Sequence, residues 1–185
     1  RGAVEGGRRV LGNLPPATLS SINNLGNLLQ AQGKLSAADP FLRESLEVSR
    51  FVLGDEHPDT LTSINNLGGL LQVQGKLSQA EPFLREALDA SRRVQGDEHP
   101  DTLVSLSNLG SLLQAQGKLS DAESLFREAL DASRRTLGAE HPNALASMNH
   151  LGILHQIQGR LPEAESLLRE ALEVRIRLMW SEHRS

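Results

Sequence analysis

Hydrophobic residues recur at steps of three and four along most of the chain, with polar residues between them. In the segment HPDTLTSINNLGGLLQVQG, the apolar or small positions are Leu61, Ile64, Leu67, Gly68 and Leu71. Residues at this spacing lie on one face of an α-helix. The pattern therefore predicts an amphipathic helix in this segment, and it never shows the alternation with a period of two that strands require.

The ends of this helix are marked by residues with restricted or permissive backbones. Pro58 is placed for the first turn, where its missing N–H costs little. Gly75 can adopt the left-handed conformation that ends a helix. We therefore predict a first helix, helix A, over residues 58–74.

A second amphipathic helix, helix B, is predicted for the segment KLSQAEPFLREALDASRRV, residues 76–94. Ser78 followed by Glu81 has the spacing of a capping box, and Pro82 is expected in the first turn. The short linker after helix A implies an antiparallel hairpin. A Glu–Arg pair four residues apart supports helix B in three places: Glu81–Arg85, Glu123–Arg127 and Glu165–Arg169.

The whole hairpin pattern repeats every 42 residues, as the positions Gly26, Gly68, Gly110 and Gly152 show. The repeats span residues 11–52, 53–94, 95–136 and 137–178. Residues 1–10 match the end of a preceding helix B, and residues 179–185 resemble the start of a further repeat or a C-terminal tail. A period of this length predicts one continuous stack of hairpins. We expect the four glycines at the contacts between helices A and B.

The repeat resembles the tetratricopeptide-repeat signature, which Leu67–Gly68, Leu71, Ala80, Leu84 and Ala87 match in type and spacing. Its 42-residue length, its LGDEHPDT lead-in and its Asn-Asn-Leu segment are similar to the kinesin light chain and nephrocystin-like type. The resemblance implies an all-α, right-handed superhelical solenoid. It also implies that A helices line the concave side and B helices the convex side.

The resemblance places ligand contacts on helix A, where this chain carries columns of amide side chains. These positions are Asn23, Asn24, Asn27 and Gln30 in the first repeat, Asn65, Asn66 and Gln72 in the second, Ser107, Asn108 and Gln114 in the third, and Asn149, His150 and Gln156 in the fourth. Amides offer a donor and an acceptor together, which suits an extended peptide backbone. The alternative is that some of them bond within the stack. The columns lack the Lys and Arg with which related proteins bind acidic peptides.

Other recurring polar residues have structural explanations. The pair Glu-His precedes helix A as Glu56–His57, Glu98–His99 and Glu140–His141, and it recurs as Glu182–His183. Equivalent residues lie one repeat apart, so we predict caps rather than a shared metal site. His155 replaces a core leucine and is expected to be buried and neutral, with one satisfied nitrogen. The pairs Arg92–Arg93 and Arg134–Arg135 fall where they favour the dipole of helix B.

The C-terminal end differs from the other repeats, because Ile176, Leu178, Met179 and Trp180 replace the Ser-Arg-Arg pattern. Trp is favoured at buried contacts between proteins. We predict an end interface formed by Ile176, Met179 and Trp180. The alternative is that Trp180 folds back onto its own hairpin.

Composition narrows the class of function. The net charge of −4 argues against nucleic-acid binding, the chain has no Cys, and no segment approaches the ~18 apolar residues of a membrane span. No catalytic, phosphate-binding or metal-binding motif appears, so we expect no enzyme and no cofactor. The predicted location is intracellular and cytoplasmic, with organelle targeting left open because the sequence begins inside a repeat.

The predicted function is a non-enzymatic scaffold that holds a peptide or a partner protein along the amide-rich concave groove. The alternative is a structural subunit of a large assembly, which contacts its neighbours through the convex face and the ends.

Overall fold

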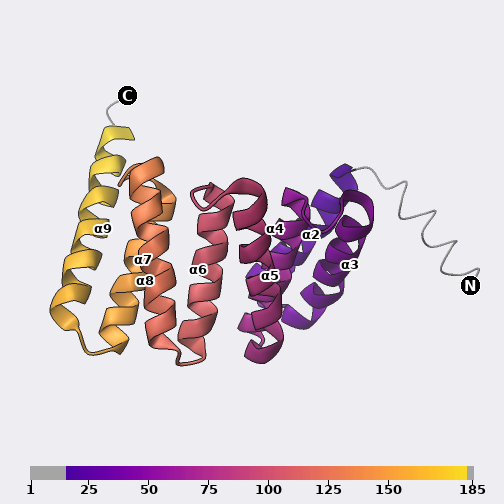
Figure 1. Cartoon of the computed structure of the whole chain (residues 1–185), viewed down its shortest axis with the longest axis horizontal. Helices are drawn as coiled ribbons and strands as arrows, with labels where there is room; N and C mark the ends of the chain where they lie inside the picture. Colours follow the sequence, from indigo (N-terminus) through magenta and orange to yellow (C-terminus); the bar gives the residue numbers. More distant parts are fainter. Residues whose placement is uncertain (1–15, 183–185) are drawn as a thin grey trace, which may run out of the picture. The chain divides into compact units, whose positions relative to one another are not determined.

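The computed structural model describes residues 16–182, which form eight α-helices joined by short turns (Figure 1). The A helices are α2 (Pro16–Ala31), α4 (Pro58–Val73), α6 (Pro100–Ala115) and α8 (Pro142–Ile157). The B helices are α3 (Leu35–Leu53), α5 (Leu77–Gln95), α7 (Leu119–Thr136) and α9 (Leu161–Glu182). Within this range there is no strand, and the predicted all-α fold of helix hairpins is confirmed.

The ends of the A helices are where the sequence predicts them. Pro58 is the first residue of α4, and the side chain of His57 accepts a hydrogen bond at the N-terminus. At the other end Gly75 has φ of 75°. The N–H of Gly75 donates to the Gln72 carbonyl and that of Lys76 to the Leu71 carbonyl, both at 2.9 Å. These two bonds form a Schellman motif, which satisfies carbonyls that the helix leaves open.

The B helices begin earlier than the capping-box pattern predicts, and that prediction is wrong. Helix α5 begins at Leu77, and the carbonyl of Lys76 already accepts the N–H of Ala80 at 3.0 Å. The capping residues of α3 and α7 are lysines that make no side-chain capping bond. The glycine turn leads directly into the helix, so Ser78 lies inside the first turn. Pro82 is consequently the sixth helical residue, beyond the first turn, and the helix continues through it.

The glycine at each A–B contact is required by close packing. A Cβ built on Gly68 would lie 2.5 Å from Cδ2 of Leu84, far inside van der Waals contact. The equivalent glycines meet the equivalent side chains: Gly26 meets Leu42, Gly110 meets Phe126 and Gly152 meets Leu168, at 2.5 to 2.7 Å. The expectation that these four glycines lie between helices A and B is confirmed.

The described helices fall into two compact units, divided after Val94. In the first unit α3 packs on α2 and α4, and in the second α7 packs on α6 and α8, with α9 against α8. The A helices also touch within each unit, α2 against α4 and α6 against α8. Each unit is thus a layer of A helices on a layer of B helices. The expectation of a single continuous domain stays a prediction.

No helix in residues 16–182 has both the length and the apolar character needed to cross a membrane.

Candidate binding face

The amide columns predicted from sequence are accessible in both units. We use the name amide face for the thirteen predicted residues of the A helices, which lie on α2 and α4 in the first unit and on α6 and α8 in the second. Asn24 and Gln156 are exposed and the other eleven are half-buried, while the leucines between them form the core. None of the thirteen is buried, although Nδ1 of His150 is itself shielded from solvent. The binding role itself stays a prediction.

One pair of amides is already bonded within the stack. Asn66 Nδ2 of α4 donates to Asn23 Oδ1 of α2 at 3.0 Å. For this pair the alternative prediction, that some amides bond within the stack, is confirmed. The hydrogen bond joins the A helices α2 and α4. Asn24, the next residue on α2, is exposed and stands beside this bridge.

A polar hollow of about 160 Å³ opens between α2 and α4 in the first unit. Its lining residues are Leu19, Ser20, Asn23, Asn24, Ser45, Ser49, Asp59, Thr62 and Ser63. At its base the hydroxyl of Ser63 lies 3.2 Å from that of Ser45 and 3.5 Å from that of Ser49. The hollow thus joins two predicted site residues, Asn23 and Asn24, to hydroxyls and one carboxylate. Sequence reasoning missed these groups because they come from three helices of two consecutive repeats.

The equivalent positions of the second unit are less polar. Two repeats later, Ser20 corresponds to Val104, Ser45 to Ala129, and Thr62 to Ala146. Asp59 corresponds to Asn143, so the carboxylate is replaced by an amide. The two units therefore offer different chemistry on equivalent surfaces.

His150 gives the amide face of the second unit an aromatic element. Its ring stacks on Phe126, with 4.9 Å between the ring centroids and an angle of 29° between the planes. Burial lowers the pKa of His150 below its usual value, because the charged form would lose hydration. His150 is therefore neutral at pH 7, and it adds no charge to the face.

His155 is buried, as predicted, with 4% of its surface exposed. The expectation of one satisfied nitrogen is wrong, because neither ring nitrogen has a hydrogen-bond partner. Nε2 lies 3.5 Å from Oε1 of Glu123, too far for a well-formed bond. His155 is left without this bond because Arg160 and Gln158 already donate hydrogen bonds to the Glu123 carboxylate.

Glu123 is the centre of a cluster that sequence reasoning did not find. Arg160 Nη1 donates to both of its oxygens at 3.0 and 3.1 Å, Gln158 donates at 3.2 Å, and Arg127 at 2.7 Å. Burial alone would raise the pKa of the Glu123 carboxyl, but these hydrogen bonds and the positive charges of Arg160 and Arg127 lower it to about 2. The predicted Glu123–Arg127 pair is confirmed, and so are the pairs Glu81–Arg85 and Glu165–Arg169.

The recurring histidines are helix caps, as predicted. The Nδ1 atoms of His57, His99 and His141 each accept a backbone N–H two residues later at 3.2 Å. In residues 16–182 no three acidic or histidine side chains come together as metal ligands would. The fourth pair extends past the described residues at His183.

The arginines at the ends of the B helices lie in the last turn, as predicted. They also bind glutamates that sequence reasoning did not assign to them. Arg93 pairs with Glu56 at 2.6 Å, and Arg135 with Glu98 at 2.5 Å. A second series links neighbouring B helices, Arg50 to Glu86 and Arg134 to Glu170. These pairs are on the surface, so each adds at most about 1 kcal/mol.

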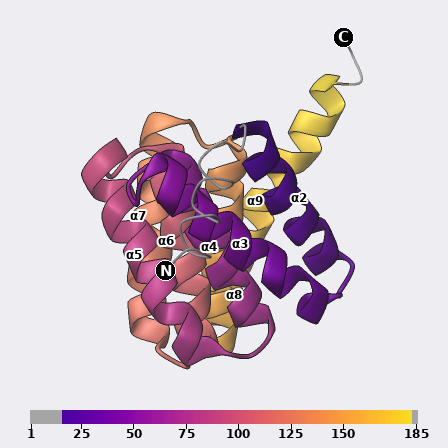
Figure 2. The ribbon, with the colours of Figure 1, turned by 90° about the vertical axis from the view of Figure 1, so that its right-hand side faces the viewer.

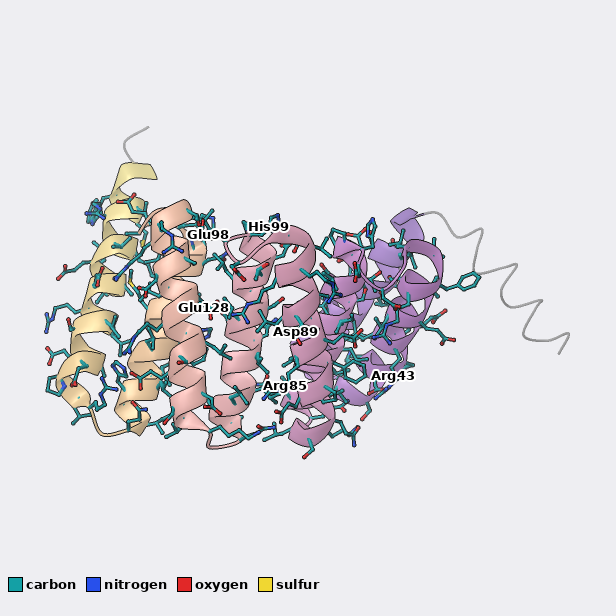
Figure 3. All side chains as sticks on the ribbon, in the orientation of Figure 1. Arg43, Arg85, Asp89, Glu98, His99 and Glu128 are labelled. Carbon is teal, nitrogen blue, oxygen red and sulfur yellow. The ribbon has the colours of Figure 1, made fainter. Side chains whose placement is uncertain are left out.

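A second hollow, of about 590 Å³, contains none of the predicted site residues. It lies between α7 and the loop that precedes α6, where Figure 3 labels Glu98, His99 and Glu128. Asp97 and Asp131 add carboxylates to its lining, and the guanidinium of Arg135 is bound to Glu98. We assign no ligand to this hollow.

The C-terminal turns of α9 project past the end of α8 (Figures 1 and 2). Trp180 is 67% exposed, so the alternative in which it folds back onto its hairpin is wrong. Helix α9 continues here because Trp180 stands where Gly138 follows α7. The end interface of Ile176, Met179 and Trp180 stays a prediction.

Comparison with known sequences and structures identifies the repeat. The profile of the tetratricopeptide repeat matches residues 17–92, 59–135 and 110–177. No curated protein compared with the chain matches it.

Solved structures of kinesin light chain-like proteins are similar to this chain. A structure of a kinesin light chain candidate from Podosopora anserina with nearly identical TPR-like repeats is 26% identical, with a TM-score of 0.69, over 96% of this chain and 89% of that one. A variant of that protein with one substitution gives a TM-score of 0.73 at 26% identity, over 89% and 78%. BtubC (BKLC) from P. vanneervenii shares the fold at 21% identity and a TM-score of 0.74 over 86% of this chain, which spans 64% of that protein.

Proposed function

Because the chain belongs to the tetratricopeptide-repeat family, we propose that it is a scaffold that binds an extended peptide segment of a partner protein along the amide face. Proteins of this family generally mediate contacts between proteins and are not enzymes. The observation that carries the proposal is the accessibility of all thirteen polar residues on the A helices.

The hollow between α2 and α4 is the part of the face best shaped for a ligand. Asn23 and Asn24 offer amide groups at its rim, and Asp59 adds a carboxylate. An extended peptide has unpaired N–H and C=O groups, which side-chain amides can satisfy. The carboxylate and the absence of Lys and Arg from the lining residues favour a peptide that is neutral or basic.

The test is peptide selection on the full chain. A phage-displayed library of random peptides is panned on the protein, and recovered peptides are measured by fluorescence anisotropy against the wild type and Asn24→Ala. Removing one amide that bonds the ligand costs about 1 kcal/mol, a loss of affinity of roughly fivefold. Gln79→Ala, an exposed change on α5, is the matched control.

Selected peptides that bind Asn24→Ala as tightly as the wild type would place the site elsewhere. Failure to recover any peptide would favour the second function, a structural subunit of a larger assembly. The exposed apolar end of α9 is the observation that supports that alternative.

A further inference from the structure

Two hollows between B helices occupy equivalent positions in the two units, and each has a volume of about 390 Å³. The first lies among α3, α4 and α5 and is lined by Arg43, Leu46, Glu47, Arg50, Leu67 and Phe83. The second lies among α7, α8 and α9, where the same positions two repeats later are Arg127, Leu130, Asp131, Arg134, Leu151 and Leu167. We call these hollows the B grooves. Figure 3 labels Arg43 at the rim of the first.

Each B groove has an apolar floor made by packed helices. In the first, Leu46 of α3 and Leu67 of α4 are 4% and 1% exposed, and their counterparts in the second are 4% and 3% exposed. These leucines are already covered by neighbouring helices, so the B grooves arise where one hairpin packs on the next. They do not depend on a helix face that lacks a neighbour. The half-buried Phe83 adds an apolar wall from α5.

The arginines at the rims are already paired with carboxylates. Arg43 Nε lies 2.6 Å from Asp39 Oδ1, and Arg50 Nη2 lies 2.5 Å from Glu86 Oε1 on α5. The second B groove repeats both pairs at equivalent positions, with 2.7 Å in each: Arg127–Glu123 and Arg134–Glu170. The positive charges of the rims are therefore neutralised within the structure.

One charge in each B groove has no partner. Glu47 lies four residues after Arg43 and three before Arg50, a spacing at which helical side chains can pair. Among residues 16–182, however, neither Glu47 nor its counterpart Asp131 takes part in an ion pair or a side-chain hydrogen bond. Each B groove thus combines an apolar floor with one unpaired carboxylate.

This combination matches the two parts of an arginine side chain. Its aliphatic stem can pack on leucines while its guanidinium stays at the rim. The guanidinium can then donate two parallel hydrogen bonds to one carboxylate. We propose that each B groove receives an arginine side chain of a partner protein, with Glu47 and Asp131 as its acceptors. The B helices thereby form a second binding face, on different helices from the amide face.

The test selects peptides for this contact on the full chain. A phage-displayed library of nonapeptides with a fixed central arginine is first depleted on the double variant Glu47→Gln/Asp131→Asn and then panned on the wild type. Recovered peptides are synthesised with arginine or with citrulline, its uncharged analogue, at the centre. By fluorescence anisotropy, citrulline and the double variant should each weaken binding at least about fivefold, because either change removes the ion pair.

Single variants and matched controls assign the site. Glu47→Gln and Asp131→Asn should each lower the number of peptides bound per chain by one in isothermal titration calorimetry. Glu44→Gln and Asp121→Asn change exposed carboxylates on the same two helices, outside the B grooves, and should leave binding unchanged. All variants should unfold at the wild-type temperature, because the carboxylates of the B grooves have no partner to lose.

Three results would overturn the proposal. The first is a library in which no peptide survives depletion on the double variant. The second is equal affinity of the arginine and citrulline peptides, which would mean that an apolar contact alone holds them. The third is a set of peptides that lose affinity in Asn24→Ala, since these would bind the amide face. None of these results bears against the proposed function of the amide face, which is tested separately.

Discussion

Gly68 illustrates how a single residue sets the distance between two helices. Its missing Cβ leaves room for Leu84, which is fully buried against the backbone of α4. The neighbouring Gly69 has open space at the same position, because it points away from α5. Two adjacent glycines in one helix therefore have opposite structural roles.

Gly68→Val should destabilise the protein by about 1–3 kcal/mol, because the new methyl groups overpack the contact with Leu84. Gly69→Ala should be neutral or stabilise by up to about 1 kcal/mol, because alanine favours the helix. Urea denaturation of both variants measures the difference. Equal destabilisation by the two changes would show that the contact with Leu84 is not the cause.

Glu123 makes a pH-dependent contribution to stability. Its folded-state pKa of about 2 lies below the ordinary value of 4.5, so the carboxylate stabilises the fold above pH 4.5. This contribution is lost as the pH falls from 4.5 through about 2. Glu123→Gln should cost about 1–3 kcal/mol at neutral pH, and the cost should shrink over that acidic range.

Urea unfolding of the wild type and Glu123→Gln at several pH values checks this expectation. Glu165→Gln removes the equivalent carboxyl of the last repeat, which is exposed and paired with Arg169. This control should cost much less at every pH. A constant difference between wild type and Glu123→Gln down to about pH 2 would contradict the assignment.

At the scale of the helix, local sequence determines where an A helix begins and ends. His99 accepts the N–H of Asp101 at 3.2 Å, and Pro100 follows it as the first helical residue. Thr102 donates to the carbonyl of Gly96 at 2.8 Å and closes the preceding loop. The cap and the loop are therefore built from residues close together in sequence.

His99→Ala should destabilise the protein by about 0.5–2 kcal/mol through loss of the cap, and His99→Asn should retain most of the stability. Thermal unfolding followed by circular dichroism compares the two variants. If His99→Asn is as unstable as His99→Ala, the imidazole does not stabilise the protein by accepting the hydrogen bond.

These elements also show what sequence can and cannot predict. The A helices, the histidine caps and the glycine contacts follow from spacing, because the interacting residues lie at fixed separations. The start of helix B was missed because the turn at Gly75 continues into the helix and makes a serine cap unnecessary. The Glu123 cluster was missed because its arginine, glutamine and histidine come from the next repeat. The α2–α4 hollow was missed for the same reason, since three helices contribute to it.

At the scale of the whole molecule, consecutive helices of each unit pack on one another. The repeat is therefore the structural unit of the chain. The residues of the amide face differ from one repeat to the next, while the core residues stay nearly constant. Equivalent positions of the A helices carry Asn, Ser or His in different repeats. The equivalent positions of the B helices, in contrast, carry a buried alanine in every repeat: Ala38, Ala80, Ala122 and Ala164. Surface and core are thus free to change independently.

The near-identity of the repeats has a consequence for how the chain reaches its native state. Leu42 beneath Gly26 and Leu84 beneath Gly68 make the same contact at the same separation. A helix of one repeat can therefore pair with the wrong partner at little energetic cost, and misassembly of this kind is typical of repeat proteins. Phe126 fills the equivalent place beneath Gly110 with an aromatic ring. A phenylalanine ring does not fit the space that a leucine fills in the other repeats, so α7 pairs best with α6. This preference lowers the number of misassembled states that compete with the native one.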